Sequence, residues 1–138
     1  MNLDNKTIVL VDDNNVTNYY NTDIVMSSGK FEKVIIHESP TQTLDFLKES
    51  LAKRMDIPSI FVIDVKMPEM DGFELIDEID ELFDQEEVEL SPIFVVLTTS
   101  NHMRDYEQFD KTPLAKKFIP KPLDEEKFNE VLKEFEFV

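Results

Sequence analysis

The sequence predicts an α/β domain built on a parallel sheet, and two observations carry that prediction. Five short apolar runs alternate with five longer stretches, most of which carry apolar residues at helical spacing. No Pro/Gly/Ser-rich linker, repeat or low-complexity segment interrupts the alternation, and 138 residues suit one domain with a substantial core. Right-handed crossovers place helices on both faces of such a sheet, but the alternation alone leaves the strand order open.

The first quarter of the chain predicts a strand, a helix and a second strand. Residues 7–11 form a β-branched run that ends abruptly in two aspartates, which is typical of a buried strand. A helix is expected from about residue 15 to residue 28, with Gly29 as its terminator. The apolar residues at helical spacing in this segment are Val16, Tyr20 and Ile24. The second strand is predicted at residues 33–37.

The middle of the chain predicts two further helices and the third strand. Ser39 suits a helix N-cap, because Pro40 then takes the first helical position. One face of that helix carries Leu44, Leu47 and Leu51. The third strand is expected at residues 59–63, ending at Asp64, and Asp71 is expected to cap the third helix. The apolar stripe of the third helix is Leu75, Ile76, Ile79, Leu82 and Phe83.

The last third predicts two strands and two helices. The fourth strand is expected at residues 92–97, a weaker helix at 103–109 and a short fifth strand at 117–119. Asp124 caps the final helix, whose acidic first turn suits the helix dipole. The residues of this segment expected to face inward are Phe128, Val131, Leu132 and Phe135.

Polar side chains follow four of the five strands: Asp12, Asp13, Asp64, Thr98 and Lys121. Ligands of open parallel sheets bind beyond the carboxyl ends of the strands, so these groups are expected to converge. Two unit charges about 4 Å apart repel by roughly 4 kcal/mol at an effective dielectric near 20, so clustered carboxylates need a cation. Oxygen ligands without cysteine suit Mg²⁺, and an aspartate beside such an ion is able to attack phosphorus and form an aspartyl phosphate.

Four short motifs in this order carry a family resemblance. They are Asp12-Asp13, Asp64 within Asp-Val-Lys-Met-Pro-Glu-Met-Asp-Gly, Leu97-Thr98, and Lys121-Pro122. Together they resemble the receiver domains of two-component response regulators, and the resemblance covers essentially the whole chain. It implies a flavodoxin-like, doubly wound five-stranded parallel sheet of order 2-1-3-4-5 with five helices.

The resemblance also implies the metal site. Asp64 is the phosphoacceptor, and the metal ligands are Asp12, Asp13, Asp64 and the backbone carbonyl of Lys66. Asp13 is the more direct ligand, and Asp12 acts partly through water. The expected cofactor is Mg²⁺, with Mn²⁺ as a possible substitute.

Three further roles follow from the same resemblance. Thr98 hydrogen-bonds the phosphoryl group, and Lys121 pairs with it from a cis peptide before Pro122. Phe118 occupies the aromatic switch position, where many relatives carry tyrosine, and turns inward as Thr98 moves. Because a long cation near the phosphoryl group would shield it or misplace the attacking water, Lys66 predicts a long-lived phosphoprotein.

Each of these residues also has a structural explanation when taken alone. The paired aspartates suit a turn or a helix N-cap, and Thr98 suits a strand end. Asp64 and Lys121 could form a plain salt bridge, and Phe118 could simply pack in the core. The combination of all of them favours the functional interpretation.

The composition limits the classes of partner that the chain is expected to bind. The net charge of −16 disfavours nucleic acids and anionic membranes, and favours a protein partner with basic features. The longest apolar runs, such as residues 93–97, are too short to span a bilayer, and the N-terminus has no signal-peptide pattern, so a cytoplasmic location is expected. The expected partners are a histidine kinase or a histidine phosphotransfer protein, and a downstream protein target.

The chain is expected to form a single receiver domain over residues 1–138, with no output domain. It is not expected to be an enzyme, apart from catalysing its own phosphorylation and autodephosphorylation. The resemblance implies that the face formed by the fourth helix, fifth strand and fifth helix is the output surface. One alternative is a receiver-like binding module that works without phosphorylation. A second is a metal-dependent phosphatase, but such enzymes usually carry a carboxylate where this chain has Lys66. Two glycines are too few for a three-glycine nucleotide fingerprint.

Overall fold

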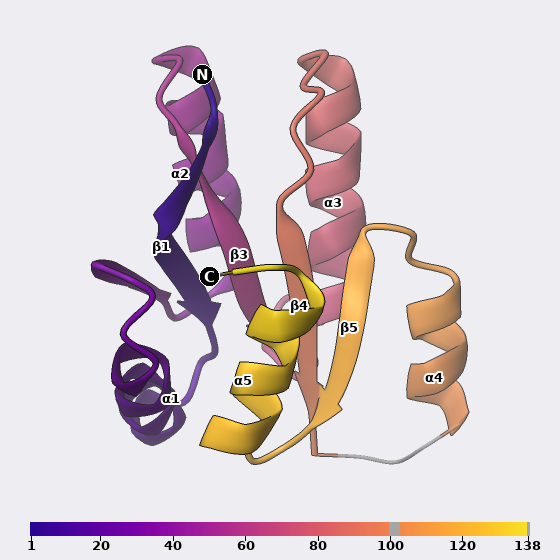
Figure 1. Ribbon diagram of the computed structural model, residues 1–138. Coiled ribbons are helices and arrows are strands. Elements are labelled where there is room, and N and C mark those ends of the chain that lie inside the picture. Colours follow the sequence, from indigo (N-terminus) through magenta and orange to yellow (C-terminus); the bar gives the residue numbers. More distant parts are fainter. Residues whose placement is uncertain (100–102, 138) are drawn as a thin grey trace.

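The computed structural model describes residues 1–99 and 103–137 and contains the predicted alternation of strands and helices. The strands are β1 Leu3–Val11, β2 Lys33–His37, β3 Ile57–Asp64, β4 Ile93–Thr98 and β5 Ala115–Pro120. The helices are α1 Asn15–Ser27, α2 Pro40–Ala52, α3 Gly72–Gln85, α4 Met103–Asp110 and α5 Glu125–Glu134. All strand pairs are parallel and the order is β2-β1-β3-β4-β5, which confirms the expected order (Figure 1).

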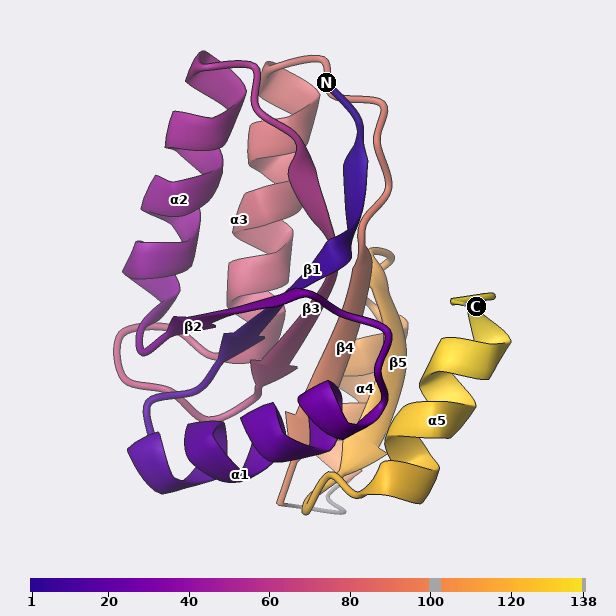
Figure 2. The same cartoon turned by 60° about the vertical axis from the view of Figure 1, so that its left-hand side comes forward.

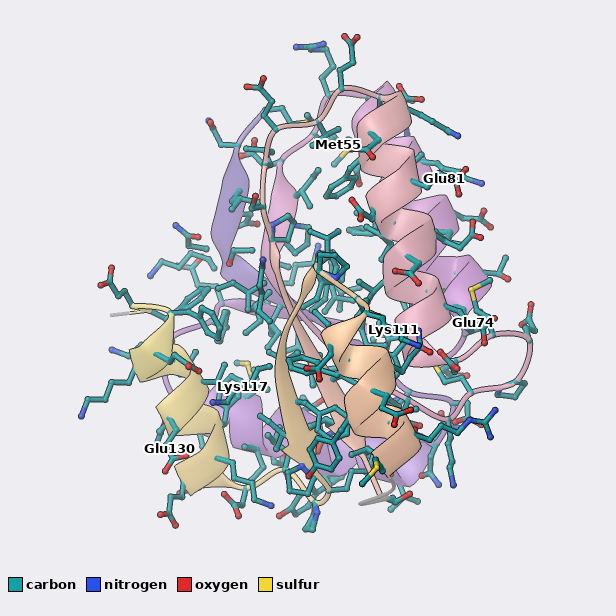
Figure 3. The ribbon with its side chains drawn as sticks, turned by 90° about the vertical axis from the view of Figure 1, so that its right-hand side faces the viewer. Met55, Glu74, Glu81, Lys111, Lys117 and Glu130 are labelled. Carbon is teal, nitrogen blue, oxygen red and sulfur yellow. The ribbon has the colours of Figure 1, made fainter. Side chains whose placement is uncertain are left out.

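Helices cover both faces of the sheet (Figures 1 and 2). One face packs against α2 and α3, where Leu47 and Ile76 join a cluster with alternate residues of β3 such as Phe61. The opposite face packs against α1 and α5. Every residue of β3 is buried, as expected for a central parallel strand with cores on both sides. Charged side chains line the outside, as Glu81 on α3 and Glu130 on α5 illustrate (Figure 3).

The predicted helix caps are confirmed. Ser39 Oγ accepts a hydrogen bond from the backbone N–H of Gln42, with Pro40 following at the first helical position. Asp71 and Glu74 form a reciprocal capping box at the start of α3. Asp124 caps α5 by accepting from the backbone of Lys127. Local sequence therefore determines where these three helices begin.

The buried face of α1 differs from the apolar stripe of its sequence. Val16 is 79% exposed and Tyr20 is 45% exposed. The residues that α1 buries are Asn18, Asn21 and Val25. The Asn18 side chain donates a hydrogen bond to the carbonyl of Asp12 at 2.8 Å, so a polar contact at the end of β1 fixes the rotation of the helix. Two apolar residues of the stripe are thereby left at the surface.

None of the helices in residues 1–99 and 103–137 is both long and apolar enough to cross a membrane.

Candidate functional site

The carboxyl ends of the strands bring the predicted polar residues together. Asp64 ends β3 and pairs in register with Leu97 of β4, one residue before Thr98. Asp12 and Asp13 follow β1, whose last residue pairs with Ile63. One carboxylate oxygen from each of Asp12, Asp13 and Asp64 lies within 4.8 Å of the others. The predicted convergence of the three carboxylates is therefore confirmed.

Lys121 joins this cluster from the turn after β5. Its Nζ lies 3.0 Å from Asp12 Oδ2 and 3.0 Å from Asp64 Oδ1. The three side chains are largely buried, with exposed fractions of 15% for Lys121, 4% for Asp12 and 8% for Asp64. The bond from Lys121 to Pro122 is a cis peptide, as expected, and the Lys121 N–H donates to the Thr98 carbonyl at 2.6 Å. Lys121 thus lies between two of the three carboxylates.

Backbone contacts fix the position of Asp12. Its N–H donates to the carbonyl of His37 in β2, and its Oδ1 accepts from the N–H of Asn14 at 2.9 Å. Its carbonyl accepts the Asn18 hydrogen bond from α1. Asp13 differs, because its side chain is exposed. Asp12 is therefore rigidly placed, whereas Asp13 is the carboxylate open to solvent.

Negative charge exceeds positive charge in this cluster. Burial raises the pKa of Asp64 to about 6, the charges of Asp12 and Asp13 add to the rise, and Lys121 opposes it. Burial works to lower the pKa of Lys121, but its contacts with Asp12 and Asp64 outweigh that effect and raise it. One ammonium group cannot balance three carboxylates. An all-oxygen donor set with excess negative charge fits a hard divalent cation such as Mg²⁺.

The loop after Asp64 returns closely to the strand. Gly72 at the start of α3 donates its N–H to the Val65 carbonyl at 2.9 Å. A Cβ placed on Gly72 would lie 2.6 Å from the Asp64 carbonyl oxygen. Lys66, within this loop, is exposed. The packing of α3 against the end of β3 therefore holds the backbone of Asp64 in place.

Thr98 and Phe118 both contact α4. Thr98 is buried, and its Oγ1 donates a hydrogen bond to Asp105 Oδ2 at 3.2 Å. Phe118 is half-buried, and its ring centroid lies 6.2 Å from that of Phe73 and 4.8 Å from that of Tyr106. Asp105 is a site residue that the sequence does not predict. Its only sequence signal is an acidic position in the first turn of a weakly predicted helix.

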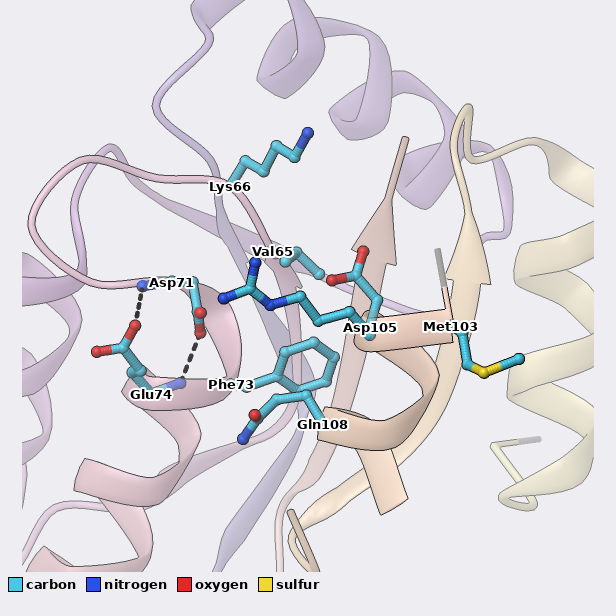
Figure 4. Close-up of a pocket in the computed structure, with 9 residues that line it drawn as sticks. Val65, Lys66, Asp71, Phe73, Glu74, Met103, Asp105 and Gln108 are labelled. Carbon is cyan, nitrogen blue, oxygen red and sulfur yellow. Dashed lines mark hydrogen bonds between the residues drawn. The ribbon is translucent and has the colours of Figure 1, made fainter. Parts of the chain in front are cut away.

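A pocket of about 800 Å³ opens between the loop after β3 and α4 (Figure 4). The close-up shows the carboxylate of Asp105 toward Val65, which follows Asp64 in the chain, and Phe73 of α3 and Gln108 of α4 also line the pocket. The same pocket is bordered by Lys66. The pocket thus links the neighbourhood of the carboxylate cluster to the first turn of α4.

Comparisons with known proteins agree with this geometry. A family model described as the response regulator receiver domain matches residues 8–133. No curated protein matches the chain. Among solved structures, a two component response regulator from Cytophaga hutchinsonii is 26% identical with a TM-score of 0.81, covering 94% of this chain and 96% of that one.

Two more distant structures share the fold. A CheY-like receiver domain protein from Methanospirillum hungatei is 20% identical with a TM-score of 0.74, covering 96% of this chain and 94% of its own. The receiver domain of the histidine kinase CKI1 from Arabidopsis thaliana, complexed with Mg²⁺ and BeF₃⁻, is 21% identical with a TM-score of 0.79, covering 95% of this chain and 89% of its own.

Proposed function

The chain belongs to the response regulator receiver domain family, and from that premise we propose that Asp64 accepts a phosphoryl group from a phosphohistidine of a partner protein. The observation that carries the proposal is the placement of Asp64: a largely buried carboxylate at the end of the central strand, paired with Lys121 and next to Asp12 and Asp13. Receiver domains act in two-component and phosphorelay signalling, and this acidic pocket fits a phosphoacceptor site.

The transfer step uses Asp64 as nucleophile and Lys121 as its electrostatic partner. With a pKa of about 6, the Asp64 carboxylate is mostly ionised at neutral pH. One of its oxygens attacks phosphorus as the P–N bond of the phosphohistidine breaks, and the released imidazole takes up a proton from water. Lys121, already 3.0 Å from Asp64 Oδ1, neutralises negative charge on the transferred group.

A divalent cation completes the site in this proposal. Asp12, Asp13, Asp64 and the backbone carbonyl of Lys66 would hold Mg²⁺, or Mn²⁺ in its place, and the ion supplies positive charge against the phosphoryl oxygens. The chain then acts on no separate substrate, and its chemistry is limited to gaining and losing its own phosphoryl group. Lys66 takes the position where a phosphatase of this type would usually carry a second carboxylate, which disfavours that alternative.

The first test is the intact mass of the protein after incubation with acetyl phosphate, with Mg²⁺ or with EDTA. We expect one added phosphoryl group in the wild type with Mg²⁺ and none in EDTA or in Asp64→Asn. If a phosphorylated histidine phosphotransfer protein also fails to label the wild type, the alternative of a phosphorylation-independent binding module replaces the proposal.

Lys66 is proposed to prolong the phosphorylated state. Its side chain is exposed and borders the pocket beyond Asp64, where a long cation is suited to shielding the phosphoryl group from water. Lys66→Asn is expected to speed dephosphorylation by about threefold to tenfold, which corresponds to ~1 kcal/mol in the barrier. The loss of the phosphorylated mass with time after donor removal measures this, and an unchanged rate would show that Lys66 has no such role.

The exposed apolar face of α1 is proposed as the docking surface for the phosphohistidine donor. A groove of about 420 Å³ lies between α1 and the turn after β5, and Val16, Tyr20, Lys121 and Leu123 are among the residues that line it. Since Lys121 both lines the groove and contacts Asp64, a protein seated in this groove would lie close to the phosphoacceptor.

Tyr20→Ala is therefore expected to slow phosphorylation by a histidine phosphotransfer protein about tenfold, as for loss of one buried aromatic contact, while leaving labelling by acetyl phosphate unchanged. Met26→Ala is a matched control, because Met26 is also on α1 and, like Tyr20, is 45% exposed. Equal effects of the two substitutions would argue against this surface.

For the output, we propose a protein target that contacts the face formed by α4, β5 and α5. The net charge of −16 favours a target with basic features over nucleic acid. Phosphorylation reaches this face through Thr98, which contacts α4, and through Phe118, which packs on Tyr106 and Phe109 of the same helix.

A further inference from the structure

Helix α4 is the most weakly anchored helix in the described part of the chain. None of its residues is fully buried, whereas α1, α2, α3 and α5 each bury three or more. Two of its side chains, Tyr106 and Phe109, pack against Phe118 of β5. Helices with few buried contacts open at low free-energy cost, so each remaining contact of α4 has a large influence on its position.

The Asp105–Thr98 hydrogen bond is such a contact. Asp105 lies in the first turn of α4 and is half-buried, and its Oδ2 accepts from Thr98 Oγ1 at 3.2 Å. The Thr98 carbonyl accepts from the N–H of Lys121, the residue that pairs with Asp64. Thr98 is therefore joined to the carboxylate cluster through its backbone and to α4 through its side chain.

A threonine hydroxyl has one hydrogen and donates it to one acceptor at a time. If the Thr98 hydroxyl is to donate to a phosphoryl group on Asp64, it must leave Asp105. We propose that Asp105 is a positioning residue that holds the Thr98 hydroxyl in the unphosphorylated protein and releases it, together with the first turn of α4, when Asp64 is phosphorylated. This inference rests on the proposed role of Asp64.

The charge of the phosphoryl group also favours the release of Asp105. A phosphoryl group adds about −1.5 to −2 of charge at neutral pH, and the carboxylate of Asp105 faces the pocket beside Val65, the neighbour of Asp64. Repulsion between the two anions favours the state in which Thr98 contacts the phosphoryl group and Asp105 has moved away. The phosphoryl group thus takes over the hydrogen bond that Thr98 donates to Asp105, and it also repels the Asp105 carboxylate.

A purely helical role for Asp105 predicts a different result. A carboxylate in the first turn stabilises a helix through its dipole whether or not Thr98 has a hydroxyl. A double-mutant cycle with Thr98→Val distinguishes the two roles, because this substitution removes the hydroxyl and keeps a similar side-chain volume. Glu107→Ala is a matched control, since Glu107 is an exposed acidic residue on the same helix.

The experiment measures the rate of phosphorylation by acetyl phosphate with Mg²⁺, and hydrogen exchange of α4 in the unphosphorylated protein. We expect Asp105→Ala to raise both rates by about threefold to tenfold, as for the loss of one ordinary hydrogen bond. Asp105→Asn, which keeps an acceptor oxygen, is expected to have a smaller effect, and Glu107→Ala none. In the Thr98→Val background, Asp105→Ala is expected to change neither rate.

Two outcomes would overturn the inference, and they are distinguishable. A wild type that takes no phosphoryl group on Asp64 from any donor would overturn the proposed function and the role of Asp105 with it. A wild type that is phosphorylated on Asp64, with Asp105→Ala acting equally with and without the Thr98 hydroxyl, would overturn the positioning role alone.

Discussion

Replacing Gly72 with alanine is expected to lower the free energy of unfolding by about 3 kcal/mol, the upper range for an overpacked buried site. The new Cβ would lie 2.6 Å from the carbonyl oxygen of Asp64, 3.1 Å from Ile63 Cγ2 and 3.2 Å from the carbonyl carbon of Asp64. The closest neighbour is backbone of the central strand, so no side-chain rotation relieves the contact. The Gly72 N–H also donates a hydrogen bond to the carbonyl of Val65, the residue after β3, so the start of α3 cannot move away from the end of β3 without losing that bond.

Gly29 provides the matched control, because it is the other of the two glycines in the chain. Its φ of 71° lies in the left-handed region, but a Cβ there would meet nothing within 4 Å. Gly29→Ala is therefore expected to cost only about 1 kcal/mol, from backbone strain alone. Urea denaturation of both variants measures the difference, and a Gly72→Ala cost no larger than that of Gly29→Ala would contradict the close-contact argument.

The same substitution has a functional consequence. Relief of the contact must move either the start of α3 or the end of β3, and Asp64 lies at the end of β3. In conditions where Gly72→Ala is still folded, phosphorylation by acetyl phosphate is therefore expected to be slower than in the wild type. Gly29→Ala, at the end of α1, is expected to keep the wild-type rate.

The sequence predicts those features whose signals are local. Asp71 and Asp124 begin their helices because a cap needs only the following turn. Asp12, Asp64 and Lys121 were found because parallel strands bring their carboxyl ends to one edge, so that a strand assignment is enough to predict convergence.

The features that the sequence does not predict depend on contacts between distant segments. The apolar stripe of Val16 and Tyr20 indicates a helix, but the hydrogen bond from Asn18 to Asp12 decides which face meets the sheet. Strand β1 begins at Leu3, four residues before the predicted start, because Leu3 pairs with Ile57 of β3. Its first residues are mostly polar, so only the pairing identifies them as strand.

The direction of the Thr98 side chain is a similar case. The sequence predicts that Thr98 ends the fourth strand, but not that its side chain contacts Asp105. That contact depends on the orientation of α4, which is set by the packing of its aromatic residues on Phe118. The proposed switch therefore includes a residue of α4 that no local pattern marks.

Asp64→Asn is expected to stabilise the metal-free protein by about 3 kcal/mol at neutral pH. Folding raises the pKa of Asp64 to about 6 from 3.8, through burial first and through Asp12 and Asp13 next. A tenfold change in proton affinity corresponds to about 1.4 kcal/mol, so this rise of the pKa, in which the opposing attraction of Lys121 is already included, corresponds to about 3 kcal/mol. The amide has nearly the same shape but carries no charge, so the repulsion from Asp12 and Asp13 disappears.

The sign of the pH dependence follows from the direction in which folding moves the pKa of Asp64. Because the folded state holds the Asp64 proton more tightly than the unfolded state, the free energy of unfolding of the wild type falls as pH rises between about 4 and 6. Below that interval Asp64 is protonated in both states, and wild type and Asp64→Asn should be equally stable. The advantage of the variant should grow across the interval and stay constant above pH 6.

Urea denaturation in EDTA at pH 4, 5, 6 and 7.5 measures this difference, in which contributions common to both proteins cancel. Mg²⁺ should reverse the order, because an ion bound by three carboxylates stabilises the wild type by about 4.1 kcal/mol at a thousand times its dissociation constant. Asp13→Asn should gain less stability in EDTA than Asp64→Asn, because Asp13 is exposed, but it should lose most of the Mg²⁺ increment. A stability difference independent of pH would contradict the repulsion argument, and a wild-type melting temperature unchanged by Mg²⁺ would contradict the proposed metal site.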